Sequence, residues 1–194
     1  MKRLALLIIV IAVAALSMAA ESGSSSLPKY LHNVSSDDAP QYVKRVDTTI
    51  KRTLTAVVSA FPLPHMGGGH TVVISFGQSI GEDNQVHLGL DIGTPIGTPV
   101  MAAGNGTIVL TGFDEDDEFG NYVVIDHGNY VKTIYGHLSS FAGLHRGATV
   151  RTGGVIGYSG ITGWVTDEAL HFEIVYRERY VDPAIVLERL GELK

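Results

Sequence analysis

Short runs rich in Val, Ile, Thr and Tyr, separated by clusters of Gly, Asn and Asp, characterise the chain beyond Phe61. They include HTVVISFG, PVMAAG, GTIVLTGF, NYVVIDHG, VKTIYGHL and ALHFEIVY. Runs of this length and composition are typical of β-strands bounded by turns. Because no helices are expected between them, we predict an all-β fold, an antiparallel β-sandwich or barrel-like structure.

Local signals add one hairpin and two short helices to this fold. His127-Gly128-Asn129-Tyr130 joins two predicted strands, and its Gly-Asn pair can adopt the positive φ values of a tight hairpin. Near the end of the chain, Asp182 can cap and Pro183 can begin a short C-terminal helix. Between residues 41 and 60 the Thr and Val content favours a strand. Apolar residues at helical spacing nevertheless lead us to expect a short N-terminal helix there, with a face made of Val43, Val46, Ile50, Leu54 and Val57.

The first residues have the layout of a secretory signal peptide. Lys2 and Arg3 precede an apolar run from Leu4 to Leu16, and small residues follow at Ser17-Met18-Ala19. We therefore expect residues 1–19 to be removed and the protein to be exported to the periplasm or cell envelope. The alternative is an uncleaved membrane anchor, because Leu4 to Ala20 approaches the roughly 17 apolar residues that can span a bilayer.

We interpret residues 20–194 as a lead-in segment followed by one domain. Residues 21–40 are rich in Ser, Asp and Pro and have few residues that can anchor a core, which is typical of a flexible tether. We place the lead-in at residues 20–60 and the folded domain at residues 61–194.

Composition narrows the function. The chain has no cysteine, so an exported form owes no stability to disulfides and carries no lipid-modified cysteine. Its formal net charge is −6, which disfavours a general basic surface for polyanions. We expect no nucleic-acid partner, and membrane contact only through the N-terminal segment if it is not cleaved.

The segment His87-Leu88-Gly89-Leu90-Asp91 contains two side chains that suit zinc, an imidazole and a carboxylate. Their spacing puts both on one face of a strand, but an ideal strand separates their Cα atoms by roughly 13 Å. The two side chains can share one metal ion only if the chain bends between them. Gly89, midway, is the residue type that permits a kink or bulge.

A third metal-binding side chain is expected from the segment Ala169–Val175. Leu170, Phe172 and Ile174 alternate with a second face that contains His171 and Glu173, so His171 points away from the predicted core. A lone histidine in a strand is more often structural than a metal ligand, and the pairing with His87 and Asp91 favours a metal site.

These motifs resemble those of the lysostaphin/LytM-type metalloendopeptidases, which have the duplicated hybrid motif fold and cleave peptidoglycan. The resemblance covers residues 61–190, through HLGLDIG, PVMAAGNGTIVLTG, GNYVVIDHGNYVKTIYGHLSS, GGVIGYSGITG and LHFEI. It implies a Zn²⁺ site with His87, Asp91 and His171 as ligands. It also implies a catalytic role for His137, whose side chain we expect on the same strand face as that of Tyr135. The implied activity is zinc-dependent hydrolysis of peptide bonds in peptidoglycan peptides.

One position departs from the family pattern. The family has an H-x-H motif whose first histidine also serves catalysis, and this chain has Ala169 there. Asp167 or Glu168 can be considered as a substitute base. The alternative is a catalytically degenerate LytM-type domain that binds peptidoglycan or activates cell-wall amidases, with amidases or divisome proteins as partners. The fold also resembles the carrier domain of sugar phosphotransferase systems, a cytoplasmic role that the leader argues against.

Three further segments have simpler explanations. His65 and His70 flank Met66-Gly67-Gly68-Gly69, which we interpret as a flexible loop bordering the groove and not as a metal or phosphate loop, because the flanking motif of a phosphate loop is missing. The acidic run from Asp114 to Glu118 lacks the ligand spacing of a calcium loop, and we expect a solvated hairpin tip. Trp164 either stacks on substrate or packs within the domain.

Overall fold

The computed structural model describes residues 46–81, 85–114 and 119–193. The predicted leader and tether lie outside these residues. Within the described part, no helix has the length and apolar character needed to cross a membrane.

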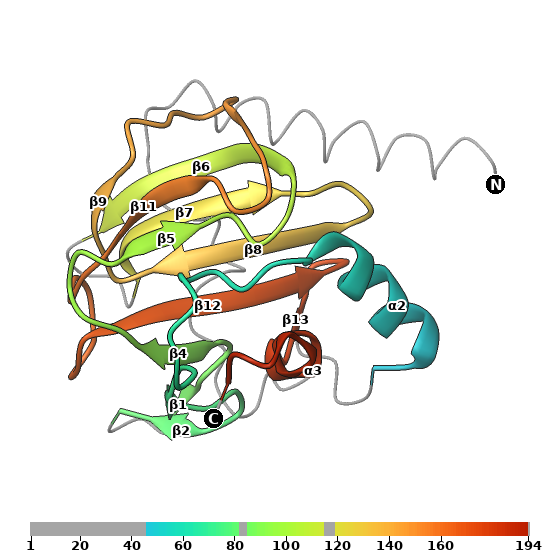
Figure 1. Ribbon diagram of the computed structural model, residues 1–194, viewed down its shortest axis with the longest axis horizontal. Coiled ribbons are helices and arrows are strands. Elements are labelled where there is room, and N and C mark those ends of the chain that lie inside the picture. Colours follow the sequence, from blue (N-terminus) through green and yellow to red (C-terminus); the bar gives the residue numbers. More distant parts are fainter. Residues whose placement is uncertain (1–45, 82–84, 115–118, 194) are drawn as a thin grey trace, which may run out of the picture.

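One large antiparallel sheet organises the molecule (Figure 1). Its strands lie in the order β1 (Val72–Ile74), β4 (Leu90–Gly93), β12 (Ala169–Tyr176), β8 (Val131–Gly136), β7 (Gly120–Asp126), β6 (Gly106–Asp114) and β10 (Thr149–Val150), and β13 (Arg179–Val181) pairs with β12. A three-stranded sheet contains β5 (Pro99–Met101), β11 (Val155–Ser159) and β9 (Leu138–Phe141), and a two-stranded ribbon contains β2 (Ser79–Ile80) and β3 (Gln85–Val86). The all-β antiparallel prediction is confirmed.

The main core lies on one face of the large sheet. Side chains that alternate along β12, Leu170, Phe172 and Ile174, are fully buried there, as predicted from their spacing. Val100 of β5 and Ile156 of β11 belong to the same cluster, so the three-stranded sheet covers this face. The alternation of apolar residues in the sequence therefore corresponds to a sandwich interior.

The other face of the large sheet is also buried in part. Leu88, Phe119, Tyr122 and Val175 belong to a second apolar cluster. Every residue of β12 from Ala169 to Val175 is therefore buried, including those that the sequence placed away from the core. This second cluster shields the polar side chains of β12 from water.

Two helical segments pack at one end of the sandwich (Figure 1). The helix α2 (Thr48–Val57) begins after Asp47, whose carboxylate accepts a hydrogen bond from the Ile50 N–H at 2.8 Å. Near the end of the chain, α3 (Ala184–Leu187) leads into the 3-10 helix η3 (Glu188–Leu190). The Arg189 guanidinium donates to the Val58 carbonyl, which joins the two helical regions. Both predicted short helices are confirmed, although Val46 of the predicted N-terminal helix face precedes α2 and Val43 lies outside the described residues.

The predicted turns are present, with some differences in detail. The β7–β8 connection has positive φ at Gly128, Asn129 and Tyr130, so the hairpin is confirmed with one left-handed residue more than the Gly-Asn pair. Asp182 accepts from the Ala184 N–H at 2.9 Å, and Pro183 is the residue before α3. The register of β6 and β7 runs to Asp114 opposite Gly120, so they form a hairpin, and residues 115–118 of the acidic run lie outside the described residues.

Candidate metal centre

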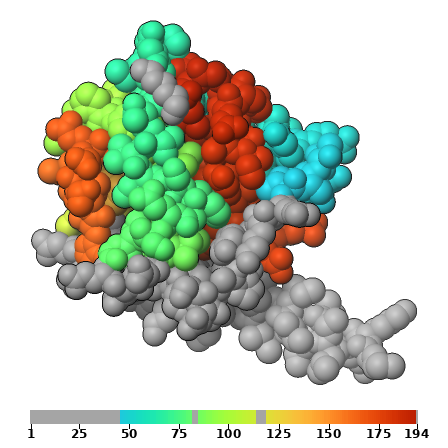
Figure 2. All heavy atoms as spheres, turned by 90° about the horizontal axis from the view of Figure 1, so that it is seen from below, coloured from blue at the N-terminus to red at the C-terminus, as the bar shows by residue number. Residues whose placement is uncertain are grey.

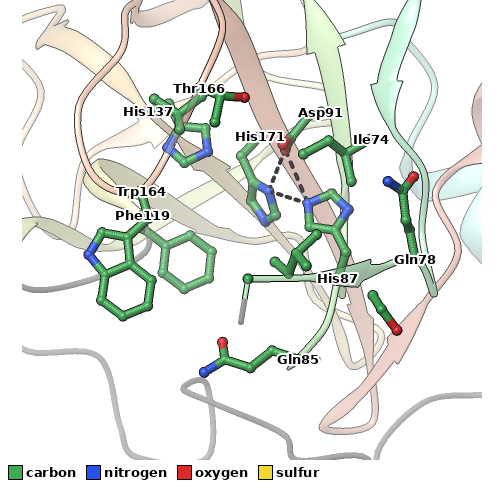
Figure 3. Close-up of a pocket in the computed structure, with 14 residues that line it drawn as sticks. Ile74, Gln78, Gln85, His87, Asp91, Phe119, His137, Trp164, Thr166 and His171 are labelled. Atoms are coloured by element: carbon green, nitrogen blue, oxygen red, sulfur yellow. Dashed lines mark hydrogen bonds and ion pairs between the residues drawn. The ribbon is translucent and has the colours of Figure 1, made fainter. Parts of the chain in front are cut away.

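Three side chains meet over strands β4 and β12 of the large sheet (Figure 3). Asp91 on β4 is directly opposite His171 on β12, and His87 lies in the bend between β3 and β4. The Asp91 Oδ1 atom is 2.8 Å from His171 Nδ1 and 3.1 Å from His87 Nε2, and the two ring nitrogens are 3.1 Å apart. The residues that the sequence singled out are therefore brought together, and all three are buried.

Position 89 requires glycine for a second reason besides the bend of the chain. A Cβ atom at this position would lie 2.7 Å from His171 Cε1 and 2.8 Å from the Phe172 carbonyl oxygen. Such approaches are sterically excluded, so glycine here leaves room for the His171 ring. The sequence predicted a bend at Gly89, and the structure adds this second reason for glycine.

Hydrogen bonds on the outer side of each ring orient the two histidines. His87 Nδ1 lies 3.1 Å from the Ser75 carbonyl oxygen, and His171 Nε2 lies 3.1 Å from Glu173 Oε1. A carbonyl oxygen accepts only, so Nδ1 of His87 is the donor. A proton on His171 Nε2 likewise donates to Glu173, so a metal ion that displaced the protons on the inner side would meet a lone pair on each inner nitrogen. Orientation of metal-binding histidines by outer acceptors is typical of metal sites.

The negative charge of the buried Asp91 carboxylate favours a positive charge at the centre of the cluster. Burial by itself raises the pKa of Asp91, but hydrogen bonds and charge from His171 and His87 outweigh it and hold that pKa well below its usual range. Burial likewise favours neutral His171, yet its hydrogen bonds to Asp91 and Glu173 raise its pKa to about 10. Three acceptors of the N and O type, converging within metal-binding reach, fit a divalent ion such as zinc.

Glu173 is a part of the site to which the sequence analysis gave no role. It is 2% exposed, one carboxylate oxygen faces His171, and Oε2 has no partner among the described residues. Burial raises its pKa, against the lowering effect of the hydrogen bond to His171. The sequence signal that could have indicated its role is its position two residues after His171, on the same strand face. The sequence does not reveal the second apolar cluster, which lies on this face.

His137 lies beside the three acceptors but does not belong to them (Figure 3). Its ring centroid is 5.5 Å from that of His171. Nδ1 is 2.9 Å from the Thr162 carbonyl oxygen and therefore donates to it, which leaves Nε2 as a free acceptor in the neutral ring. Burial, together with the charge of His171, lowers the pKa of His137 to about 4. A neutral imidazole at this position can accept a proton.

The prediction that Tyr135 and His137 share a strand face is wrong. Tyr135 is buried in the main core, where its hydroxyl accepts from the Ala103 N–H at 2.9 Å. His137 follows the end of β8 with φ of 59°, in the left-handed region. This residue breaks the alternation of the strand and turns the imidazole to the metal site.

A cleft of about 590 Å³ opens over these residues. Gln85 of β3 and Gln78, directly before β2, border it on one side. Phe119, Trp164 and His137 lie on the other side of the metal cluster (Figure 3). Trp164 is 63% exposed, so it lines the cleft without packing into a core. The Phe119 ring meets His171 edge-on, with centroids 5.2 Å apart.

Ala169 occupies the position at which the family pattern has a second histidine. Ala169 pairs with Gly93, two positions along β12 from His171, and is buried. Neither Asp167 nor Glu168 lines the cleft. The Glu168 carboxylate instead accepts from the Ile96 N–H, and Asp167 accepts from the Thr166 hydroxyl. Neither acid therefore takes the place of the missing imidazole in this structure.

The loop between His65 and His70 does not border the cleft, contrary to our expectation. His70 is 1% exposed and stacks on Phe61, with ring centroids 5.0 Å apart. It also pairs with Leu193, so this loop lies against the end of the chain, where green and red segments adjoin in Figure 2. Met66, Gly69 and His70 line a separate pocket.

The sequence pattern of peptidase family M23 matches residues 85–183, which include the three acceptors and His137. The chain belongs to peptidase family M23. The matched region begins at β3 and ends just before α3, so it contains the whole metal cluster.

Relatives of known name agree with this assignment. The chain is 46% identical over 96 residues to the peptidoglycan DD-endopeptidase ShyA of Vibrio cholerae, covering 50% of this chain and 22% of that protein. It is 37% identical over 125 residues to the cell division protein DipM of Caulobacter vibrioides, covering 61% of this chain and 20% of that protein. The chain thus spans only about a fifth of the length of these relatives.

Solved structures show the same fold. A zinc-containing peptidase from Vibrio cholerae superposes with a TM-score of 0.56 at 32% identity, covering 64% of this chain and 38% of that one. The catalytic domain of lysostaphin from Staphylococcus simulans gives a TM-score of 0.56 at 28% identity, covering 64% of this chain and 99% of that one. The predicted resemblance to the lysostaphin type is confirmed.

Proposed function

We propose that this chain is a zinc-dependent endopeptidase that hydrolyses peptide bonds of peptidoglycan in the cell envelope. The observation that carries the proposal is the convergence of His87 Nε2, Asp91 Oδ1 and His171 Nδ1, with the outer ring nitrogens already engaged by Ser75 and Glu173. The named activity of the relative ShyA, peptidoglycan DD-endopeptidase, supports the substrate class.

Three protein ligands leave a coordination position free, as in catalytic zinc sites. Bound zinc supplies Lewis acidity, which acidifies water and polarises a peptide carbonyl. The chain's own residues do the rest. His137 accepts a proton at Nε2 from the attacking water and donates it to the leaving amine. The Thr162 carbonyl holds the His137 ring by its Nδ1–H.

The side chains that line the cleft suit a peptide substrate. Gln78 and Gln85 present amide groups that can pair with a peptide backbone, and the exposed indole of Trp164 can cover an apolar part of the substrate. We propose Trp164 as a substrate contact, because it borders the cleft and is largely exposed.

A second candidate function follows from Ala169. Without the second imidazole, the domain can act as a metal-holding regulator that binds peptidoglycan or activates cell-wall amidases. The division role named for the relative DipM supports this alternative. The intact cluster of three acceptors favours the enzyme, since a purely regulatory domain has no need of a metal site with an open position.

The two candidates are separated by measuring zinc and turnover on the same preparation. Purified full-length protein is assayed for bound zinc and for release of soluble fragments from peptidoglycan, with and without a chelator, beside Ala169→His. The enzyme proposal expects about one zinc per chain and chelator-sensitive release. Zinc binding without release by the native protein, together with release by Ala169→His, would contradict the enzyme proposal and support the regulator.

We also propose export of the protein, with residues 1–19 as the leader, residues 20–60 as the lead-in and residues 61–194 as the catalytic domain. The envelope substrate of the relatives supports an exported location. N-terminal sequencing of protein from the envelope fraction tests the leader. A terminus near Ala20 supports cleavage, and an intact Met1 supports a membrane anchor.

A further inference from the structure

The connection that carries His137 is held from both ends by one short segment, residues 119–121. The His137 N–H donates to the Phe119 carbonyl at 2.8 Å. Two residues along the same segment, the side-chain amide of Asn121 donates from Nδ2 to the Leu138 carbonyl at 2.9 Å. The backbone is therefore fixed on both sides of the His137 Cα atom.

Thr162 completes this arrangement through its hydroxyl and its carbonyl. The Thr162 hydroxyl accepts from the Asn121 N–H at 2.9 Å and donates to the Leu138 carbonyl at 2.8 Å. The Thr162 carbonyl accepts from His137 Nδ1 at 2.9 Å. The Leu138 carbonyl thus accepts two hydrogen bonds, one for each of its lone pairs. Thr162 therefore links the start of β7, the connection after β8 and the imidazole ring.

The close approach of Thr162 to this segment requires glycine at position 120. A Cβ atom there would overlap the backbone of Thr162 and Gly163. Gly120 also has a φ of 57°, in the left-handed region that favours glycine. The glycine allows the loop before β12 to lie against the start of β7, which brings the Thr162 hydroxyl within reach of Asn121.

The backbone conformation of His137 needs support from neighbouring segments. A φ of 59° is uncommon for a residue with a β-carbon, and such conformations persist where the surrounding structure enforces them. The hydrogen bonds from Asn121 and Thr162 provide this support, because they hold the carbonyl of the residue that follows His137. They thereby keep the imidazole beside the metal cluster, where its ring centroid is 5.5 Å from that of His171.

We propose that Asn121 and Thr162 are positioning residues for proton transfer. Together they hold the His137 ring with Nδ1–H on the Thr162 carbonyl, so that Nε2 is the nitrogen that accepts a proton. Neither Asn121 nor Thr162 lines the cleft, so both act through His137 and not on the substrate. Their effect on turnover rests on the proposed hydrolysis of peptidoglycan peptides, whereas the orientation of the ring can be measured without substrate.

The orientation of the His137 ring is tested by ¹⁵N NMR of full-length protein labelled at its histidines, at neutral pH. The ring signals of His137 are those missing from His137→Ala. In the native protein we expect one neutral tautomer, with the proton on Nδ1. Thr162→Val removes the hydroxyl but keeps the shape of the side chain, so the Thr162 carbonyl is no longer held at Nδ1 and both tautomers should be populated. Asn121→Ala removes the amide donor to Leu138 and should produce a smaller change of the same kind.

The effect on catalysis is measured by kinetics and zinc content of the same variants. Thr162→Val should lower kcat by about 10–100-fold, because a small displacement of a catalytic group can cost that much. KM and bound zinc should be unchanged, since Thr162 contacts neither the cleft nor the metal cluster. Thr162→Ser keeps the hydroxyl and should restore the single tautomer and most of kcat. Thr98→Val is the matched control, because the Thr98 hydroxyl donates to the Pro95 carbonyl at 2.7 Å, outside the cleft lining.

Melting temperatures show that each variant is folded, and Asn121→Ala decides alone if Thr162→Val does not fold. A native tautomer and native kcat in the folded variants would overturn the proposal. Loss of zinc in step with kcat, or a raised KM at native kcat, would likewise overturn it, since either assigns these residues to another part of the site. If the native protein hydrolyses nothing, the proposed function fails, and the tautomer of His137 in the variants still decides whether Asn121 and Thr162 position its ring.

Discussion

The metal-binding half of the site and the half to which we assign proton transfer differ in the backbone that holds them. Asp91 and His171 are opposite one another in the ladder between β4 and β12, so the register of the sheet sets their separation. His137 instead has a left-handed conformation between β8 and β9, and the position of its expected companion is occupied by Ala169. Two of the three metal-binding side chains are therefore held by paired strands, whereas the proposed proton transfer depends on one connection and one side chain.

Removal of the central acceptor is expected to have the largest effect. Asp91 Oδ1 contacts both imidazoles, so Asp91→Ala should reduce bound zinc from about one per chain to near zero and abolish peptidoglycan release. Elemental analysis and a turnover assay measure both effects. Asp167→Ala, at an exposed acid outside the cleft, should keep zinc and activity. Retention of zinc in Asp91→Ala would show that the metal binds elsewhere.

The second test acts on the proton-transfer half alone. His137→Ala should keep its zinc and lose ~10²–10⁴ in kcat, the usual contribution of general acid-base catalysis. Single-substrate kinetics and zinc content on the same sample check this. His145→Ala removes an exposed histidine and serves as the matched control. If His137→Ala loses zinc in proportion to its activity, His137 contributes to the metal half, and the division drawn above is wrong.

A smaller effect is expected from the residue behind the metal-binding histidine. Glu173→Gln keeps the size of the side chain but removes its charge, and should weaken zinc binding ~10–100-fold. Competition with a chromophoric chelator at constant pH measures this change. Glu178→Gln, which alters an exposed glutamate, should leave zinc affinity unchanged. An unaltered affinity in Glu173→Gln would assign Glu173 to packing only.

The mildest change concerns the bend between His87 and Asp91. Gly89→Ala places a methyl group against His171 and should cost about 1–3 kcal/mol, seen as a fall of several degrees in Tm. Zinc affinity should fall several-fold as the ring shifts. Gly67→Ala is the control, because a Cβ there meets nothing within 4 Å. Equal melting temperatures for Gly89→Ala and the native protein would mean that the bend tolerates a side chain.

The sequence predicted those parts of the site that depend on local periodicity. The alternation around His171 indicated which face it occupies, and the glycine between His87 and Asp91 indicated the bend. Both signals lie within a few residues of the atoms concerned. The same holds for the β7–β8 hairpin, because Gly128 and Asn129 are residue types that readily adopt the positive φ values of the turn.

The parts that sequence reasoning missed depend on tertiary packing. A positive φ at His137 is unusual for a residue with a side chain, and the surrounding strands impose it, so strand alternation gave the wrong face for this residue. The second apolar cluster, which includes Val175 on the strand face of Glu173, also contains Phe119 and Leu88 from distant segments. The position of His70 depends on its pairing with the end of the chain. None of these tertiary features produces a periodic pattern of residues in the sequence.

The order in which the ligands occur along the chain also affects when the site can exist. Asp91 and His171 are 80 residues apart in sequence and meet only when β4 pairs with β12. Closing a loop of that length costs chain entropy before the contacts between the two strands compensate for it. An unfolded chain, such as one in transit through an export channel, holds at most the two neighbouring ligands. The capacity to bind the ion tightly, and any hydrolytic activity, therefore arises only in the compartment where the chain folds.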